Sequence, residues 1–430
     1  MSASKHERAE IAVVGAGHAG LAAAGELVAA GKDPVVLEAS DAVGGRVRTD
    51  NHEGFLLDRG FQVYLTAYPE GQRVLDYAAL DLKPFEAGAL VNCDGRLHKI
   101  ADPLRRPELV LDTLRAGIGT LGDKLRVVKL RNRAVNCSLA ELWQRRETTA
   151  LEALREIGFS ASIIQKFFRP WLGGIFLTRE LDVSSRAMDF VVRMMAKGDV
   201  TLPSQGMESI SRQLARRAGA QRIRLNSPVA SIEQTTLRLA DGSTIEADHV
   251  VLATEAPVAA RLLGKPEMDP GARSVTCLYF AADSAPIEEP WLVLNGDRDV
   301  LVNHLVVPSN VSRAYAPAGQ HQVSATVLDT RGLGDEALVD AVRGELRAWH
   351  GAAVDRWQHL RTYRIAHAQP MQSVGFRDRR AIARRWGART LVTCGDHVES
   401  ASIQGALLSG RRAAEHVLES SRRGASEAAA

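Results

Sequence analysis

A glycine-rich turn between an apolar strand and a helix constrains the fold of this chain more than any other feature. Residues 10–14 (EIAVV) are apolar and β-branched, as in a buried parallel strand. A G-x-G-x-x-G pattern follows at Gly15, Gly17 and Gly20, and helical spacing of apolar residues continues from Ala19 to Gly31. Residues 33–38 (DPVVLE) indicate a second strand. This order predicts a Rossmann-type βαβ unit.

The same segment predicts a site for a dinucleotide. Gly15 permits the tight turn, Gly17 lets the backbone approach a pyrophosphate, and Gly20 lets the helix pack closely on the strand. The phosphates would lie at the helix N-terminus, where unpaired N–H groups and the helix dipole favour negative charge. Glu38 ends the second strand, where a carboxylate accepts hydrogen bonds from ribose hydroxyls and disfavours a 2′-phosphate.

A second G-x-G-x-x-G pattern, at residues 117–122, does not predict another such site. It follows LVLDTLRA, which has helical spacing, and no acidic residue lies at the distance of a ribose-binding carboxylate. We expect an interrupted or kinked helix here. The sequence therefore indicates one dinucleotide site and no separate nicotinamide-binding domain.

Composition excludes several other classes of protein. The 430 residues are 45% hydrophobic and 24% charged, which is ordinary for a globular protein, and a net charge of +3 does not indicate a nucleic-acid partner. Four widely spaced cysteines predict neither a metal site nor a disulfide framework. The first residues lack a signal-peptide core, and no run of about 18 apolar residues occurs, so we expect a cytoplasmic protein. Residues 419–430 are polar and are expected to be a disordered tail.

The residues after the second strand extend the pattern. Glu38 and Ala39, followed by Gly44-Gly45-Arg46, resemble the fingerprint of the flavin amine oxidase, protoporphyrinogen oxidase and phytoene desaturase superfamily, closest to its desaturase-like branch. The resemblance implies FAD, bound non-covalently, with the Gly-Gly-Arg segment on its pyrophosphate. The chemistry agrees, because two glycines permit close backbone approach and Arg46 would supply a charge-assisted phosphate contact.

Three further segments resemble the same pattern. Gly60 precedes a strand that would bring residues 61–64 towards the flavin, and residues 229–253 resemble the return of the chain into the FAD domain. Residues 390–410 resemble the C-terminal flavin motif, whose helix would point its dipole at the flavin C2 carbonyl. The resemblance implies these cofactor-binding positions: Gly15, Gly17, Ala19, Gly20, Glu38, Ala39, Gly44, Gly45, Arg46, Gly60, Phe61, Gln62, Val63, Val229, Thr254, Gly395, Asp396, Ser402, Ile403 and Gly405.

We therefore expect an α/β fold with two discontinuous domains. Residues 1–80, 203–265 and 385–418 would form a Rossmann-type FAD-binding domain, and residues 81–202 and 266–384 an α+β substrate domain. Helical spacing predicts helices over 104–122, 138–158 and 160–168, whereas SVTCLYFA and QVSATVLD alternate and predict an antiparallel sheet.

One position is informative for what it lacks. Amine oxidases of this superfamily typically carry a lysine on a substrate-domain strand that resembles residues 274–280, on or beside Thr276. No lysine occurs after Lys265, so amine oxidation of the lysine type is disfavoured. Some relatives bind flavin covalently through cysteine, but Cys394, at a strand end, is expected to be a buried apolar residue.

The sequence does not establish the catalytic residues. Candidates for the substrate pocket are Tyr64, Trp171, Trp357, Tyr363 and His367, and each aromatic residue has the alternative of filling the core. Among them, the candidates for a catalytic role are Tyr64, Tyr363 and His367. Both His367 and His397 are of a type that can act as acid or base, although a single histidine is more often structural.

The partner of such a chain would be a small molecule, apolar or aromatic in character. Residues 104–133 mix aliphatic and basic side chains, which indicates either a solvated basic face or peripheral membrane contact. The sequence does not determine the oligomeric state or the electron acceptor, for which oxygen or a quinone is expected.

Three functions are consistent with these observations. The first is an FAD-dependent oxidoreductase that removes hydride from a C–H bond of an apolar or mixed small molecule. An amine oxidase or protoporphyrinogen oxidase-like enzyme is the second. The third is a non-catalytic lipid-binding escort of the same architecture, like the Rab GDP-dissociation inhibitors; Glu38, Arg46, Gly395 and Asp396 favour a retained cofactor instead.

Overall fold

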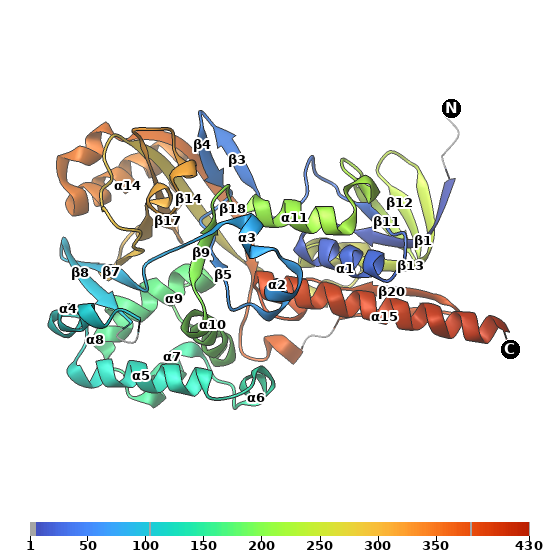
Figure 1. Ribbon diagram of the computed structural model, residues 1–430, viewed down its shortest axis with the longest axis horizontal. Coiled ribbons are helices and arrows are strands. Elements are labelled where there is room, and N and C mark those ends of the chain that lie inside the picture. The colour runs from blue at the N-terminus through green and yellow to red at the C-terminus, as the bar shows by residue number, and fades with distance from the viewer. Residues whose placement is uncertain (1–5, 103–104, 379–380, 430) are drawn as a thin grey trace.

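The computed structural model describes residues 6–102, 105–378 and 381–429, and for 424–429 it describes the backbone (Figure 1). The helices are α1 His18–Ala29, α2 Pro69–Val74, α3 Tyr77–Leu80, α4 Val110–Arg115, α5 Leu121–Val135, α6 Leu139–Gln144, α7 Ala150–Ile157, α8 Ala161–Ile163, α9 Arg169–Phe176, α10 Ser185–Lys197, α11 Glu208–Ala218, α12 Ala256–Leu263, α13 Pro308–Val311, α14 Asp335–His350 and α15 Ile403–Ala429. The strands are β1 His6–Val14, β2 Val35–Leu37, β3 Thr49–His52, β4 Phe55–Asp58, β5 Tyr64–Leu65, β6 Leu82–Pro84, β7 Gly88–Cys93, β8 Arg96–Ala101, β9 Val200–Pro203, β10 Ile223–Arg224, β11 Val229–Glu233, β12 Thr236–Leu239, β13 Thr244–Leu252, β14 Ala272–Ala282, β15 Val293–Asn295, β16 Val302–Val306, β17 His321–Val327, β18 Gln358–Pro370, β19 Ala383–Trp386 and β20 Arg389–Thr393.

The first sheet contains the predicted βαβ unit. Parallel pairing gives the order β10-β2-β1-β13-β20, and the antiparallel strands β11 and β12 extend from the first half of β13. The tight turn between β12 and β13 includes Gly242, at φ +86°. Helices α1, α11 and α15 lie together along this sheet (Figure 1). Because the strands that end at Val14, Leu37, Leu252 and Thr393 run in parallel, their carboxyl ends meet at one edge.

The second sheet has the order β18-β14-β17-β16-β15-β7-β8. Its pairs are antiparallel except for β15 with β7, which confirms the predicted antiparallel sheet. Residues of β14 alternate between its faces, as strand geometry requires. Leu278 and Phe280 pack with α14, whereas Cys277 and Tyr279 pack with β4 and Phe61.

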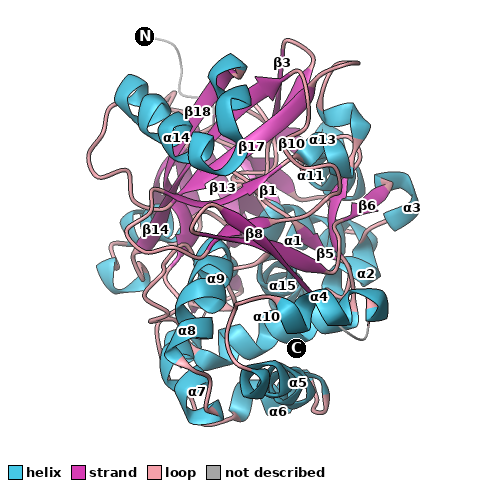
Figure 2. Ribbon diagram, turned by 90° about the vertical axis from the view of Figure 1, so that its left-hand side faces the viewer, coloured by secondary structure: helices cyan, strands magenta, loops and turns pink. Residues whose placement is uncertain are grey.

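Helices α5–α8 gather at the bottom of the view in Figure 2. In α4 and in these helices, the residues at which a helix begins or ends differ from the sequence prediction. The helix expected over 104–122 is α4, which ends at Arg115; residue 104 lies outside the described residues. The helix expected over 138–158 is divided into α6 and α7, because the chain leaves α6 at Arg145 and Thr149 caps the next helix. Residues 164–168 form a π-turn that joins α8 to α9.

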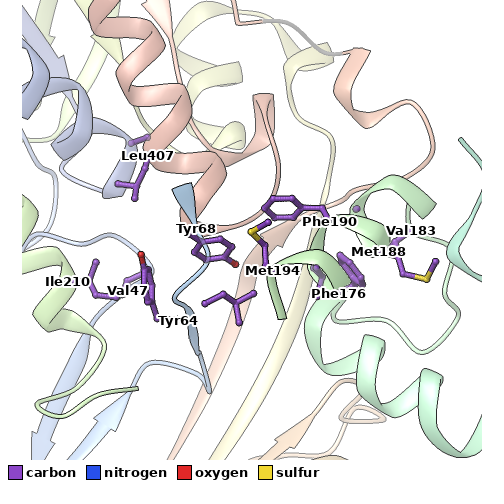
Figure 3. Close-up of a cluster of buried hydrophobic side chains, with 14 of the residues drawn as sticks. Val47, Tyr64, Tyr68, Phe176, Val183, Met188, Phe190, Met194, Ile210 and Leu407 are labelled. Atoms are coloured by element: carbon purple, nitrogen blue, oxygen red, sulfur yellow. The ribbon is translucent and has the colours of Figure 1, made fainter. Parts of the chain in front are cut away.

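One hydrophobic core joins the two sheets. Figure 3 shows part of it, where Val47, Ile210 and Leu407 come from around the first sheet and Phe176 and Phe190 come from α9 and α10. Tyr68 stacks on Phe190 with ring centroids 6.2 Å apart, across this boundary. The two parts are therefore held together by continuous apolar packing.

The C-terminal residues differ from the disordered tail expected over 419–430. Helix α15 continues to Ala429, and Ala430 lies outside the described residues. The preceding turns of α15 are anchored, because Leu407, Ala414 and Val417 are buried against the first sheet and α1, and Ser420 within the tail is buried as well. Ser421 then contacts Nε2 of His249 at 2.8 Å.

Candidate functional site

The turn between β1 and α1 has the geometry of an anion cradle. Gly15 has φ +104°, and a Cβ there would lie 2.8 Å from the carbonyl oxygen of Ala253. A Cβ on Gly20 would overlap the carbonyl oxygen of Gly15. Gly17, in contrast, has open space where a Cβ would lie, and as N-cap of α1 it provides no side-chain hydrogen bond. The first N–H groups of α1 therefore face open space without a capping side chain.

The N-terminus of α5 after the second glycine pattern is different. Thr120 caps it, with its hydroxyl accepting from the N–H of Asp123 at 3.1 Å, and Asp123 accepts from the N–H of Thr120 at 2.7 Å. Ser160 also donates to Asp123 from its backbone, at 2.8 Å. An anion would meet a carboxylate at this helix end, so residues 117–122 do not form a second phosphate site.

Glu38 lies where the ribose of a dinucleotide would be expected. Its carboxylate is buried at the end of β2 and accepts from the N–H of Ala16 at 2.7 Å and from the N–H and hydroxyl of Ser40 at 2.9 and 2.8 Å. Ala39, predicted beside it, is exposed. Glu38 thus ties β2 to the glycine-rich turn and fixes its own orientation.

The Gly-Gly-Arg segment packs directly on that turn. Gly44 forms a β-bridge with Gly17, and its N–H donates to the carbonyl of Ala16 at 2.8 Å. Gly44 and Gly45 have φ +109° and +60°, which explains the choice of glycine at both positions. The segment brings Arg46 to the same edge of the sheet.

Arg46 meets the predicted C-terminal segment. Its Nη2 donates to Oδ1 of Asp396 at 2.7 Å, and its Nη1 donates to the carbonyl of Ala368 at 3.1 Å. Gly395, at φ +151°, donates its N–H to the hydroxyl of Ser409 at 2.9 Å. The Gly-Gly-Arg segment, β18 and the C-terminal motif therefore converge on one guanidinium group.

Helix α15 begins at Ile403, as predicted. Ser402 caps it by accepting from the N–H of Gly405 at 3.0 Å, and a Cβ on Gly405 would overlap the carbonyl oxygen of Ser400. Ala19 contributes to packing, because its carbonyl oxygen lies where a Cβ of Gly410 would be. These contacts seat α15 against α1.

The remaining positions predicted to bind the cofactor lie around the same edge. Thr254 follows β13 beside Gly15, and its hydroxyl is buried without a hydrogen-bond partner among the described residues. Val229 is buried at the start of β11. Gln62 donates from Nε2 to the carbonyl of Arg46 at 2.9 Å, and Val63 packs on the main core. The predicted segments therefore meet, although the chain separates them widely.

Gly60 and Phe61 connect this edge of the first sheet with the second sheet, because both contact its strands. Gly60 has φ +86°, and a Cβ there would lie 2.8 Å from Cδ1 of Ile365 on β18. The ring of Phe61 lies 5.3 Å from that of His304 on β16 and 6.1 Å from that of Phe85. The segment predicted to meet the flavin thus lies at the junction of the two parts.

Sequence reasoning missed one contact in the cradle. His18, an unspecified position of the glycine pattern, is buried, and its Nε2 lies 2.9 Å from the hydroxyl of Ser211 on α11. That hydroxyl donates to the carbonyl of Val47 at 2.9 Å, so the imidazole is the donor to Ser211. Burial, and then the charge of Arg46, lower the pKa of His18 to about 4. No local signal links residues 18 and 211.

The residues present fit FAD. The N-terminus of α1 has no side-chain cap, and the hydroxyl of Thr254 has no hydrogen-bond partner among the described residues. A dinucleotide in the open space over Gly17 would supply partners for both. Cys394 is buried, and burial raises the pKa of its thiol to about 12, which agrees with an inert core residue rather than a covalent flavin link.

The lysine position was predicted on or beside Thr276, and the structure shows which of these residues of β14 faces Phe61. Thr276 pairs with Val327 and Arg364, whose side chains lie on the α14 side, where Arg364 donates to Asp335 at 2.7 Å. Thr276 therefore faces away from Phe61, and Cys277 is the residue of β14 that faces it. A register shift between Arg273 and Val275 makes this alternation hard to assign from sequence.

Tyr64 is not placed for catalysis. It is fully buried in the core of Figure 3, and its hydroxyl lies 2.9 Å from that of Tyr77. Burial raises the pKa of Tyr64, followed by the hydrogen bond with Tyr77. Its apolar surroundings explain the misassignment, since an aromatic residue beside a motif is equally suited to a core.

The other candidates lie in separate places. Tyr363, on β18 beside Cys277, donates to Asp50 at 2.7 Å. His367 is exposed and lines a small cavity with Arg46, Asp396 and His397. Trp171 stacks on Phe167, and Trp357 is buried against Phe280 on the α14 side, away from Phe61. Tyr363 and His367 therefore lie near the junction of the two parts of the protein, whereas Trp357 lies away from it.

Comparisons with known proteins agree with this site. The chain is 23% identical to coproporphyrinogen III oxidase of Propionibacterium freudenreichii in an alignment that covers 95% of this chain and 90% of that protein. A segment covering 17% of the chain is 42% identical to 4,4'-diapophytoene desaturase of Staphylococcus haemolyticus, of which it covers 16%. A putative protoporphyrinogen oxidase from Exiguobacterium has a similar fold, with a TM-score of 0.69 and 21% identity over 97% of this chain and all of that one.

The sequence profile described as flavin containing amine oxidoreductase matches residues 18–418, which run from the start of α1 through the Gly-Gly-Arg segment and the second sheet to the C-terminal motif. Among the described residues, no helix is both long and apolar enough to span a bilayer. The substrate of such an enzyme is a small molecule, and its cofactor is FAD. The chain belongs to the flavin-containing amine oxidoreductase family and is an FAD-dependent oxidoreductase.

Proposed function

We propose that this enzyme dehydrogenates a C–H bond of a small molecule and does not use lysine-assisted amine oxidation. The observation that carries the proposal is on β14, where the residue facing Phe61 is Cys277. Cys277 is buried, and burial raises the pKa of its thiol, so this position supplies neither an ammonium group nor a thiolate. No lysine follows Lys265 elsewhere in the sequence.

The chain's own residues would act by binding and positioning. We propose that Gly17 and Arg46 hold the pyrophosphate, Glu38 the ribose, and Asp396 the ribityl side, with Gly60 to Val63 beside the ring. FAD, when bound, accepts the hydride. Because the residues of β14 that face Phe61, Cys277 and Tyr279, supply no strong base, orientation and exclusion of water would supply most of the rate.

A porphyrinogen oxidase activity is the second candidate. The support is specific, because the relative named coproporphyrinogen III oxidase aligns with 95% of this chain, whereas the desaturase match covers 17% of it. Both activities remove hydrogen from C–H bonds, so they share the role proposed for the junction. Oxygen or a quinone would accept the electrons.

The test is a spectrum of the purified, FAD-loaded enzyme, followed by anaerobic photoreduction and then substrates. We expect flavin bands that bleach and return on aeration, and no rapid reduction by NADPH. Reduction of the flavin by coproporphyrinogen III would favour the porphyrinogen oxidase activity. Reduction of the flavin by a polyene would favour the desaturase-like activity. Rapid reduction by putrescine, or by NADPH, would contradict the proposal.

We also propose that α4 and α5 form a peripheral membrane-binding surface. Large apolar side chains are unusually exposed there: Leu111 is 61% exposed, Leu121 67% and Leu125 75%. Arg115 and Lys129 are exposed on the same two helices. Apolar side chains flanked by basic ones favour the interface of an anionic bilayer.

Vesicle flotation tests this surface. We expect the holoenzyme to float with vesicles containing phosphatidylglycerol and to float less with phosphatidylcholine alone. The double variant L121E/L125E should lose flotation, whereas L225E, which changes an exposed leucine after β10, should retain it. Equal flotation of the double variant and the parent enzyme would refute the proposal.

A further inference from the structure

Buried polar side chains form a row across the second sheet on the side of Phe61. Backbone pairing aligns Tyr363, Cys277, Thr326 and His304 on four adjacent strands. Cys277, Thr326 and His304 are at most 3% exposed, and the thiol of Cys277 lies 3.2 Å from the hydroxyl of Ser324 in the same face. The opposite face is apolar and packs on α14. Since burying polar groups is costly, this row requires an explanation.

His304 has a defined tautomer. Asn303 donates from Nδ2 to the carbonyl of Pro170 at 2.9 Å, which fixes the orientation of its amide. The same Nδ2 lies 3.1 Å from Nδ1 of His304, so Nδ1 is the acceptor and Nε2 carries the proton. Burial lowers the pKa of His304 to about 3, so the imidazole is neutral at physiological pH.

The Nε2–H group of His304 is buried and has no partner among the described residues. A buried donor without a partner costs about 1–3 kcal/mol. The ring is nevertheless held in place, because Phe61 packs on it and a Cβ on Gly174 of α9 would lie 2.8 Å from its Nδ1. A rigid, neutral and unsatisfied donor beside the flavin-binding segment has the properties of a ligand-binding group.

We propose that His304 orients the substrate by donating a hydrogen bond from Nε2 to it. The substrate would then carry an acceptor, such as a carboxylate or carbonyl oxygen, close to the C–H bond that is oxidised. This inference rests on the proposed function and narrows it, because a purely apolar substrate would leave the donor unsatisfied.

The test uses benzoate and toluene as probes, which share a ring and differ in the acceptor. Their binding to the FAD-loaded enzyme is followed by the change in flavin absorption. We expect benzoate to bind at least about tenfold more tightly than toluene, because hydrogen bonds to charged groups are among the stronger ones. His304→Phe should lose this preference without a change in toluene binding, and His304→Gln, which keeps an N–H donor, should retain part of it.

Stability separates this role from a structural one. His304→Phe should unfold at about the same temperature as the parent enzyme, because it removes an unsatisfied donor together with one hydrogen bond from Asn303, whose Nδ2 keeps the carbonyl of Pro170. His249→Phe is the matched control: both ring nitrogens of His249 are within 2.8 Å of a hydroxyl, so this variant should lose stability and keep the benzoate preference. Equal benzoate affinity in the parent and His304→Phe, or no spectral response of the parent to benzoate, would overturn the inference. Failure of photoreduction would instead refute the proposed function.

Discussion

Nη2 of Arg46 lies 2.7 Å from Oδ1 of Asp396, although 350 positions separate the two residues in the chain. The pair connects the Gly-Gly-Arg segment to the motif before α15. The side chain of Arg46 remains 32% exposed and that of Asp396 10%, so the guanidinium is open on one side. The same group can therefore hold the C-terminal segment and contact a phosphate.

Removal of the Arg46 charge should weaken cofactor binding. For Arg46→Met we expect FAD affinity to fall about tenfold or more, since a charge-assisted hydrogen bond contributes about 1.5–3 kcal/mol. Titration of the apoenzyme with FAD measures this affinity. Arg8→Met removes a solvent-exposed pair with Asp248 and should leave the affinity unchanged. Similar FAD affinity in both variants would exclude Arg46 from the cofactor site.

Two glycines of the cradle should respond differently to alanine. Gly17→Ala should leave the unfolding temperature of the apoenzyme almost unchanged, because Gly17 has φ −71° and open space at its Cβ position, yet it should weaken FAD binding. Gly20→Ala should destabilise the apoenzyme itself, because its Cβ would overlap Gly15. Thermal unfolding with and without FAD distinguishes the two; a large loss of apoenzyme stability in Gly17→Ala would contradict this assignment.

A second pair of glycines tests the packing of α15 on α1. Gly410→Ala should destabilise the protein by about 1–3 kcal/mol, because a Cβ there would overlap the carbonyl oxygen of Ala19 on α1. Gly344→Ala, on α14, faces open space and should stabilise by about 0.5–1 kcal/mol through helix propensity. Urea unfolding gives both values. A neutral or stabilising effect of Gly410→Ala would show that α15 tolerates a looser fit than its contacts indicate.

Asp58 should make stability depend on pH. It is buried, and burial raises its pKa to about 6 even though Thr49 and Tyr315 donate to it. The folded state therefore holds a proton more tightly than the unfolded state, and this contribution is complete below about pH 4 and lost as pH rises through 6.

The comparison with Asp58→Asn isolates this effect. Between pH 4.5 and 7.5 the parent should lose about 2 kcal/mol of unfolding free energy relative to the variant, whose side chain does not titrate. Urea unfolding of both proteins at the two pH values measures the difference. A difference that does not change with pH would mean that Asp58 is ionised throughout this range in the folded protein.

Local patterns predicted the first sheet well. The β1–α1–β2 unit, the positive φ angles of Gly15, Gly44 and Gly45 and the start of α15 at Ile403 follow from residue spacing and from the conformations that glycine alone adopts easily. Thr149 shows the limit of this approach. Spacing suggested one helix over 138–158, but the capping box at Thr149 starts a new one.

The groups that surround a given side chain could not be predicted from local patterns. Tyr64 follows a flavin-like segment yet lies in the core, and the sequence left open whether Thr276 or a neighbour faces Phe61, which the structure assigns to Cys277. Both outcomes depend on which elements pack on a face and on a register shift within a strand. Neither is encoded by the neighbouring residues alone.

The sequence by itself determined the class of cofactor site, because glycine spacing, an acidic strand end and a Gly-Gly-Arg segment are local requirements of a backbone that approaches phosphates. Only the tertiary structure decided which distant groups complete it. The contacts of Arg46 with Asp396, of His18 with Ser211 and of Phe61 with His304 join residues far apart in the chain. Such contacts arise from the packing of whole sheets and helices, which fixes side-chain positions that no sequence interval specifies.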